Sequence, residues 1–172
     1  MGTTRLFYAR ALLVAGGMQR GPQYEQALVA VMTGEDSAAT WNPLDTTLPW
    51  HGATPYNSFG PNSDYHVWNY PTPAEGIAAT LATMEQPNMA RWFDAMRTEG
   101  KTSFQLMIAF SLTPWGGIGD KLPFEIVQEY AAGRRNYVAD RRNQVYGCGH
   151  WPYMANGEPQ PPARPVTGVA SQ

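Results

Sequence analysis

The sequence predicts a mainly helical domain that carries one long aromatic loop. Three observations support this fold class. Apolar residues recur at spacings of three and four along most of the chain, which is the pattern of helices with one buried face. Capping residues, Pro and Gly stand where these segments begin and end. Residues 40–71 lack the helical period and are rich in Pro, Asn and aromatic residues, which indicates a loop or a small β-ribbon region.

Length and composition narrow the class of protein. A chain of 172 residues can form one domain with a buried core. Its net charge of -2 gives no electrostatic reason to expect a nucleic acid or an anionic membrane as partner. Cys148 is the only cysteine, so an internal disulfide and an all-cysteine metal site are excluded. No apolar stretch reaches the roughly 18 residues of a membrane-spanning helix, so we expect no membrane association.

The first expected helix covers residues 4–15. Thr3 or Thr4 can cap its start, and the pair Gly16-Gly17 can end it. Arg10 interrupts the N-terminal apolar run, so an amphipathic helix fits this segment better than a secretory signal peptide. We therefore expect a protein made in the cytoplasm without an export signal of its own.

The second expected helix begins at Pro22 and runs to about Thr33, with Gly34 ending it. One face follows the spacing i, i+4, i+7, i+11 and consists of Tyr24, Leu28, Val31 and Glu35. A carboxyl group on an apolar face is partly desolvated, which favours its neutral form and raises its pKa. Such a group can donate a proton to a glycosidic oxygen near neutral pH. The alternative is that Glu35 is a helix-end residue that points into water.

The long connection over residues 40–71 is the second unusual feature. A loop of this length without structure is rare in a compact domain unless it is functional. Short β-ribbon segments are expected within it, with turns at Asn57-Ser58 and Asn62-Ser63. Aromatic faces pack well on sugar rings, although about half of these side chains are expected only to anchor the loop. The aromatic residues concerned are Trp41, Trp50, Tyr56, Trp68 and Tyr70.

Three further helices are expected between the loop and residue 113. The first begins at a capping-box pair, Thr72 and Glu75, with Pro at the first helical position. The second covers residues 89–99 behind an Asn88 cap, and the third begins at Thr102 or Ser103.

A last long helix is expected from Pro123 to about Tyr146, with a Pro-rich tail after it. The domain then covers residues 1–146 and the tail covers residues 147–172. The helix has a basic face, which fits either a solvated surface or a contact with an acidic neighbouring subunit. That face carries Arg134, Arg135, Arg141 and Arg142.

Other kinds of chemistry have little support. His51, His66 and His150 are scattered without the spacing of a metal site. The serines lack a nucleophile-elbow setting, and the glycines at 116–119 do not follow a strand as a phosphate loop does. We therefore expect neither a metal nor a cofactor.

A hydrolase that uses two carboxylates would need a partner for Glu35. Asp36, Asp45 and Asp64 are all near in sequence. Asp45 follows Asn-Pro-Leu and fits an ordinary turn residue better. Ring-closing transglycosylation can proceed with one acid/base group, so activity does not require the partner.

Six short motifs occur in order and together resemble one known family. They are Trp41-Asn-Pro-Leu-Asp-Thr-Thr47, Gly52-Ala-Thr54, Tyr56-Asn-Ser-Phe-Gly60, Asn69-Tyr-Pro-Thr72, Glu75-Gly-Ile-Ala-Ala-Thr80 and Ser111-Leu-Thr-Pro-Trp-Gly-Gly117. The family is a lysozyme-like domain of actinobacterial phages, found in endolysins and in virion or tail-associated lysins. The resemblance covers about residues 4–118. In that family the Glu of a Glu-Gly-Gly motif before Asn-Pro-Leu is the catalytic acid. Glu35 matches it, with Asp36 and Ser37 in place of the two glycines.

The resemblance implies a lysozyme-like fold and cleavage of the β-1,4 link between N-acetylmuramic acid and N-acetylglucosamine in peptidoglycan. The reaction would be that of a lysozyme or a lytic transglycosylase, with Glu35 as general acid and base. Asn42, Thr46 and Thr47 would form the wall of the site. The remaining substrate-binding residues would be Trp41, Trp50, Tyr56, Asn57, Tyr70 and Trp115.

A second interpretation is a structural virion protein of the tail or capsid, built on the same fold with weak or no activity. Residues 120–172 would then contact other virion proteins. In both interpretations the protein is made in the host cytoplasm, and it is then part of the virion or acts on the host cell wall.

Overall fold

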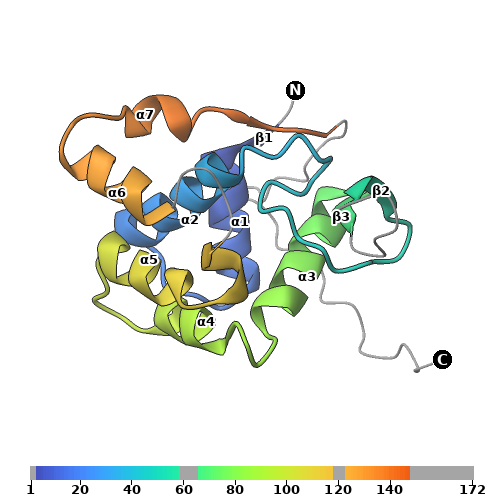
Figure 1. Cartoon of the computed structure of the whole chain (residues 1–172), viewed down its shortest axis with the longest axis horizontal. Helices are drawn as coiled ribbons and strands as arrows, with labels where there is room; N and C mark the ends of the chain where they lie inside the picture. Colours follow the sequence, from blue (N-terminus) through green and yellow to red (C-terminus); the bar gives the residue numbers. More distant parts are fainter. Residues whose placement is uncertain (1–2, 59–65, 118–122, 148–172) are drawn as a thin grey trace, which may run out of the picture.

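The computed structural model describes residues 3–58, 66–117 and 123–147 (Figure 1). They form a mainly helical structure, as the sequence predicts, with two small antiparallel sheets. The helices are α1 (Arg5–Ala15), α2 (Pro22–Glu35), α3 (Pro73–Met84), α4 (Ala90–Arg97), α5 (Ser103–Ser111), the 3-10 helix η1 (Pro114–Gly117), α6 (Pro123–Ala131) and α7 (Tyr137–Asp140). The strands are β1 (Thr3–Thr4), β2 (Thr54–Ser58), β3 (His66–Asn69) and β4 (Gln144–Val145).

Helix α2 is the centre of the fold. It packs against α1, α5, α6 and α7, and Figure 1 shows it in the middle of the helical part. Every residue from 27 to 33 is buried, so the helix is enclosed on all sides rather than on one face. The expected face of Tyr24, Leu28 and Val31 is indeed buried. Glu35 is the last residue of this helix.

Side-chain caps fix several helix starts where the sequence predicts them. Thr4 Oγ1 accepts a hydrogen bond from the backbone N of Phe7 at 3.2 Å. Thr72 Oγ1 likewise accepts from the N of Glu75 at 3.2 Å, and it donates to the Glu75 carboxylate at 2.8 Å. Thr102 forms a complete capping box with Gln105 at the start of α5.

Two expected helix boundaries were wrong. Helix α2 does not end before Gly34 but continues through Glu35, and the chain leaves it at Asp36, whose φ of 43° lies in the left-handed region. Burial of the helix on all sides outweighs the weak helix propensity of one glycine. Asn88 does not cap the fourth helix, because that helix begins at Ala90 without a side-chain cap.

The prediction of one long helix from Pro123 to about Tyr146 was also wrong. Helix α6 ends at Ala131, Gly133 turns the chain with a φ of 66°, and α7 and β4 follow. The four arginines therefore share no helical face. Arg135 forms an ion pair with the buried Asp140, which also accepts a hydrogen bond from the Tyr130 hydroxyl at 2.9 Å. This network holds the chain reversal and was not visible as a pattern in the sequence.

The two sheets tie distant segments together. Strand β4 pairs with β1 in the register Thr3 to Val145, an arrangement that the sequence did not predict. Strands β2 and β3 form the expected ribbon, with an irregularity between Pro55 and Asn57. Asn57 lies within β2, so the expected turn there was wrong. The expected turn at Asn62-Ser63 and the tail after residue 147 lie outside the described residues.

Candidate active site around Glu35

Glu35 stands at the point where the buried helix α2 opens into the loop that precedes β2. Its side chain is half-buried. Burial of the carboxylate and, to a smaller extent, the nearby charge of Asp45 together raise the pKa of Glu35 from 4.5 to about 8. The carboxyl group is therefore mostly protonated at neutral pH. The sequence prediction of a perturbed carboxyl at this position agrees with the structure.

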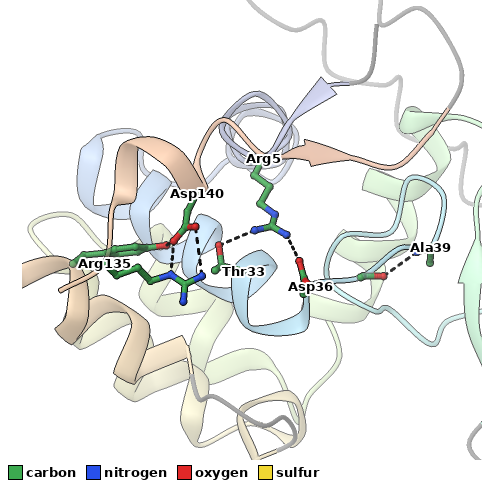
Figure 2. A network of polar contacts seen from close by, with 8 residues as sticks. Arg5, Thr33, Asp36, Ala39, Arg135 and Asp140 are labelled. Carbon is green, nitrogen blue, oxygen red and sulfur yellow. Dashed lines mark hydrogen bonds and ion pairs between the residues drawn. The ribbon is translucent and has the colours of Figure 1, made fainter. Parts of the chain in front are cut away.

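The residue after Glu35 is held by an ion pair across the fold. Arg5 on α1 reaches the end of α2, where its Nη2 lies 2.6 Å from Oδ1 of Asp36 (Figure 2). Its Nη1 donates to Thr33 Oγ1 at 3.2 Å. The Arg5 side chain is 7% exposed and that of Asp36 is 83% exposed. The pair fixes the direction in which the chain leaves α2, at a backbone conformation that would suit glycine.

Ser37 connects this turn to Asp45. The Ser37 Oγ accepts a hydrogen bond from the backbone N of Ala39 at 3.2 Å. Burial raises the pKa of the Asp45 carboxyl, and a hydrogen bond from the same Ser37 side chain offsets part of this rise. A hydroxyl group can do both, because it accepts through a lone pair and donates through its proton. Ser37 therefore has a polar role at this turn.

Asp45 lies in a turn, as the sequence predicts, but its carboxyl group is partly buried. Its backbone has a φ of 51°, and its N donates to the carbonyl of Asn42 at 3.3 Å. Its Oδ1 is buried and accepts no hydrogen bond from any residue in the described part of the chain. The side chain does not behave as an ordinary turn residue facing water. Its position ten residues after Glu35 could have been noted, but only the folded loop brings the two carboxyl groups together.

Asn42 and Thr46 hold the loop from the inside. Asn42 is fully buried, and its Nδ2 donates to the carbonyls of Thr46 and Trp68, each at 2.9 Å. Its Oδ1 accepts from the N of Thr46 at 2.8 Å. The Thr46 hydroxyl lies 3.3 Å from that of Thr80 on α3. Both side chains stabilise the wall of the site and cannot contact a ligand directly.

Trp41 is a structural anchor rather than a sugar platform. Its side chain is 1% exposed, its N donates to the carbonyl of Tyr146 at 2.7 Å, and its carbonyl accepts from the Tyr8 hydroxyl at 3.2 Å. A Cβ on Gly76 would lie 2.1 Å from the Trp41 carbonyl oxygen. A Cβ on Gly147 would lie 2.3 Å from the Trp41 ring. The expected contact of this indole with a sugar is therefore excluded.

The other predicted binding residues differ in how exposed their side chains are. Tyr70 is buried and donates from its hydroxyl to the carbonyl of Leu48 at 2.8 Å, so it also anchors the loop. Thr47 and Trp50 are half-buried, and the Thr47 carbonyl accepts from the Trp68 indole at 3.1 Å. Tyr56 and Asn57 on β2 are exposed. Trp115 is half-buried and meets Trp92 edge-on, with ring centroids 6.1 Å apart.

Neither a metal cluster nor a membrane span adds to this site. Within the described ranges, no three His, Cys, Asp or Glu side chains gather as metal ligands. The same residues include no helix with the length and hydrophobicity needed to cross a bilayer. No protein-family model, curated protein or solved structure matches the chain.

Proposed function

We propose that this protein cleaves the glycan strands of peptidoglycan, on a lysozyme-like fold, with Glu35 as the proton donor. The observation that carries the proposal is the position and protonation of Glu35. It lies at the end of a buried helix, beside a loop with aromatic residues, and its pKa of about 8 keeps the proton on the carboxyl at neutral pH. The sequence resemblance to the phage lysins supports the choice of substrate.

In the proposed reaction Glu35 gives its proton to the oxygen of the β-1,4 link, which lowers the barrier to breaking the bond at C1. The resulting carboxylate then serves as a base. General acid catalysis of this kind typically contributes about 10²- to 10⁴-fold in rate. A carboxyl with an ordinary pKa would be ionised at neutral pH and could not act as the acid.

Sugar rings would contact those predicted binding residues that remain accessible. The aromatic faces of Tyr56, Trp50 and Trp115 are exposed or half-buried, and the amide of Asn57 is exposed beside Tyr56. Aromatic side chains with polar tips suit the apolar faces and hydroxyl groups of glycans. The buried Trp41, Asn42, Thr46 and Tyr70 hold the loop that carries Trp50.

The function is tested by the variant Glu35→Gln against purified actinobacterial peptidoglycan. The wild-type protein is expected to clear the suspension between about pH 5 and 7, and Glu35→Gln to lose at least about 100-fold in rate. Glu85→Gln is a matched control, because Glu85 is an exposed carboxylate at the end of α3. Circular dichroism must show that all three proteins are folded. Equal clearing by wild type and Glu35→Gln would refute the role of Glu35.

We also propose a second candidate, in which the protein is a structural part of a phage tail or capsid with weak or no activity. The chain reversal around α7 favours it, because Arg134 and Arg142 are exposed there while the buried Asp140 is already paired with Arg135. This leaves positive charge for an acidic virion protein. Both candidates place synthesis in the host cytoplasm. Co-purification with intact virions, lost in the double variant Arg134→Glu/Arg142→Glu, would support the second.

A further inference from the structure

We propose that Arg5 is a positioning residue for the cleavage reaction, which holds the last turn of α2 and so fixes the direction of the Glu35 side chain. The inference rests on the proposed function of Glu35. It gives a role in the reaction to the start of α1 and to the C-terminal segment that holds the backbone there. The sequence resemblance assigns neither role.

The guanidinium group of Arg5 contacts the chain on both sides of Glu35 (Figure 2). Its Nη1 donates to Thr33 Oγ1 at 3.2 Å, and its Nη2 lies 2.6 Å from Asp36 Oδ1. Glu35 lies between these two anchors as the last residue of α2. Helix ends fray, because their last carbonyl groups lack partners within the helix. A planar group that bonds both anchors at once restrains this turn.

Arg5 acts on the turn rather than on the carboxyl group of Glu35. An α-helix has about 3.6 residues per turn, so the Glu35 side chain leaves α2 roughly 200° around the helix from that of Thr33. Glu35 therefore points away from the side of α2 that Arg5 contacts. The raised pKa of Glu35 agrees with this geometry, because its causes are burial and the charge of Asp45. Arg5 thus holds the turn without occupying the side on which a substrate would meet Glu35.

The backbone of Arg5 is held in turn by the C-terminal segment. The N of Arg5 donates to the carbonyl of Asn143 at 2.8 Å. One residue earlier, Thr4 pairs with Gln144 between β1 and β4, and its side chain caps α1. These bonds fix the point from which the arginine side chain extends. Its burial then restricts the side-chain torsions, so the guanidinium group has a defined position.

The burial of this charge is a separate argument for a role beyond stability. The Arg5 side chain is 7% exposed, whereas that of its ion-pair partner Asp36 is 83% exposed. Burying a charge is costly, and a partner that remains in water offsets little of that cost. An apolar side chain of similar volume often stabilises such a position equally well. A requirement for one defined direction of the turn explains the guanidinium group better than stability does.

The test compares wild type, Arg5→Met, Arg5→Lys and the control Arg97→Met on soluble glycan strands, with loss of intact strands measured by chromatography. Methionine keeps most of the buried volume but bonds neither anchor, and lysine keeps the charge without the planar fork. Arg97 is a matched control, because its guanidinium group also holds a helix end. It donates to the carbonyl of Gly16, at the other end of α1 from Arg5, at 3.0 Å.

Arg5→Met should lower kcat about 10- to 100-fold with little change in KM, because a misdirected acid slows the chemical step more than it weakens binding. Arg5→Lys should recover part of that loss, and Arg97→Met should match wild type. Urea unfolding must show that all four proteins are folded under the assay conditions.

A second measurement needs no substrate. Carbon-13 NMR titration of the same four proteins follows the ionisation of Glu35. Arg5→Met should lower the pKa of Glu35 from about 8 toward 4.5, because a loosened turn lets water reach the carboxyl group. Arg97→Met should leave this pKa unchanged.

The outcomes separate this inference from the proposed function. Wild-type kcat or an unchanged Glu35 pKa in Arg5→Met would overturn the role of Arg5 and leave cleavage by Glu35 intact. Equal losses of kcat in Arg5→Met and Arg97→Met would do the same. If Arg5→Met does not fold, a wild-type kcat in Arg5→Lys would overturn the role of Arg5. A wild type that cleaves no glycan would overturn the proposed function and this inference with it.

Discussion

Asp45 and Glu35 lie close enough that the charge of Asp45 helps to raise the pKa of the Glu35 carboxyl. The two residues come from different elements, Glu35 from the end of α2 and Asp45 from the loop before β2. Burial contributes the larger part of the shift. This relationship leads to predictions for the ionisation of the site, the stability of the fold and the reaction.

Replacing Asp45 by Asn should lower the pKa of Glu35, because a negative charge that opposes ionisation is removed. The pKa should remain above 4.5, since burial still acts. Carbon-13 NMR of the glutamate carboxyl groups over pH 4–10 measures it. Asp94→Asn, an exposed surface change, is the control. An unchanged Glu35 titration would mean that the two groups do not interact.

The raised pKa also predicts how stability depends on pH. Above pH 4.5 the unfolded chain releases the Glu35 proton while the folded protein keeps it until about pH 8. The contribution of Glu35 to folding is therefore complete below pH 4.5 and is lost as pH rises to about 8. Glu35→Gln has no carboxyl group to ionise at this position. Between pH 4 and pH 9 its free energy of unfolding should therefore rise by about 3–5 kcal/mol relative to that of wild type.

Urea unfolding of wild type and Glu35→Gln at several pH values measures that difference. The exposed Glu85→Gln variant should follow the wild-type curve. Parallel pH curves for wild type and Glu35→Gln would show that the carboxyl is not desolvated in the folded protein.

The Arg5 to Asp36 pair should stabilise the fold mainly through its Arg5 side. The Arg5 side chain is buried and also bonds Thr33, whereas Asp36 is largely exposed. Arg5→Ala is expected to cost about 1–3 kcal/mol, because it removes buried packing and a hydrogen bond. Asp36→Gly should change stability by less than about 1 kcal/mol, since glycine relieves the left-handed backbone while the exposed ion pair is lost. Chemical denaturation measures the free energy of unfolding of both variants, and equal losses in the two would contradict this prediction.

Gly76→Ala should destabilise the protein although alanine is the better helix former. The added Cβ would lie 2.1 Å from the carbonyl oxygen of Trp41, so α3 and the loop must move apart. We expect a loss above about 2 kcal/mol in thermal or chemical unfolding. Gly133→Ala is the control, because nothing lies within 4 Å of its Cβ position and only the cost of a positive φ of about 1–2 kcal/mol applies. A neutral or stabilising Gly76→Ala would show that Trp41 is not held there.

The sequence predicted the features that local rules govern. The helix starts at Thr4, Thr72 and Thr102 follow from capping chemistry, and the buried face of α2 follows from spacing. The features that it missed depend on tertiary contacts. The reversal after Ala131 is held by Arg135 and Asp140, and pairing of β1 with β4 joins the two ends of the described chain.

The candidate site likewise combines features that the sequence predicted with features that it did not. The position of Glu35 on an apolar face was readable from its spacing, but the side of the loop that each aromatic residue faces was not. Trp41 and Tyr70 proved buried, whereas Tyr56 lies in β2, where every residue from Thr54 to Asn57 is exposed. The loop before β2 folds inward around Asn42. The proximity of Asp45 to Glu35 depends on how the loop folds, so it could not be read from the sequence.

The most direct test of the central claim is the pH dependence of the release of soluble fragments from actinobacterial peptidoglycan. If Glu35 is the proton donor, kcat/KM should fall as pH rises through about 8, where the carboxyl loses its proton. Glu35→Gln should release no soluble fragments at any pH at which it is folded. A wild type without activity from about pH 4 to 8 would contradict the account. So would a Glu35→Gln variant with the wild-type profile.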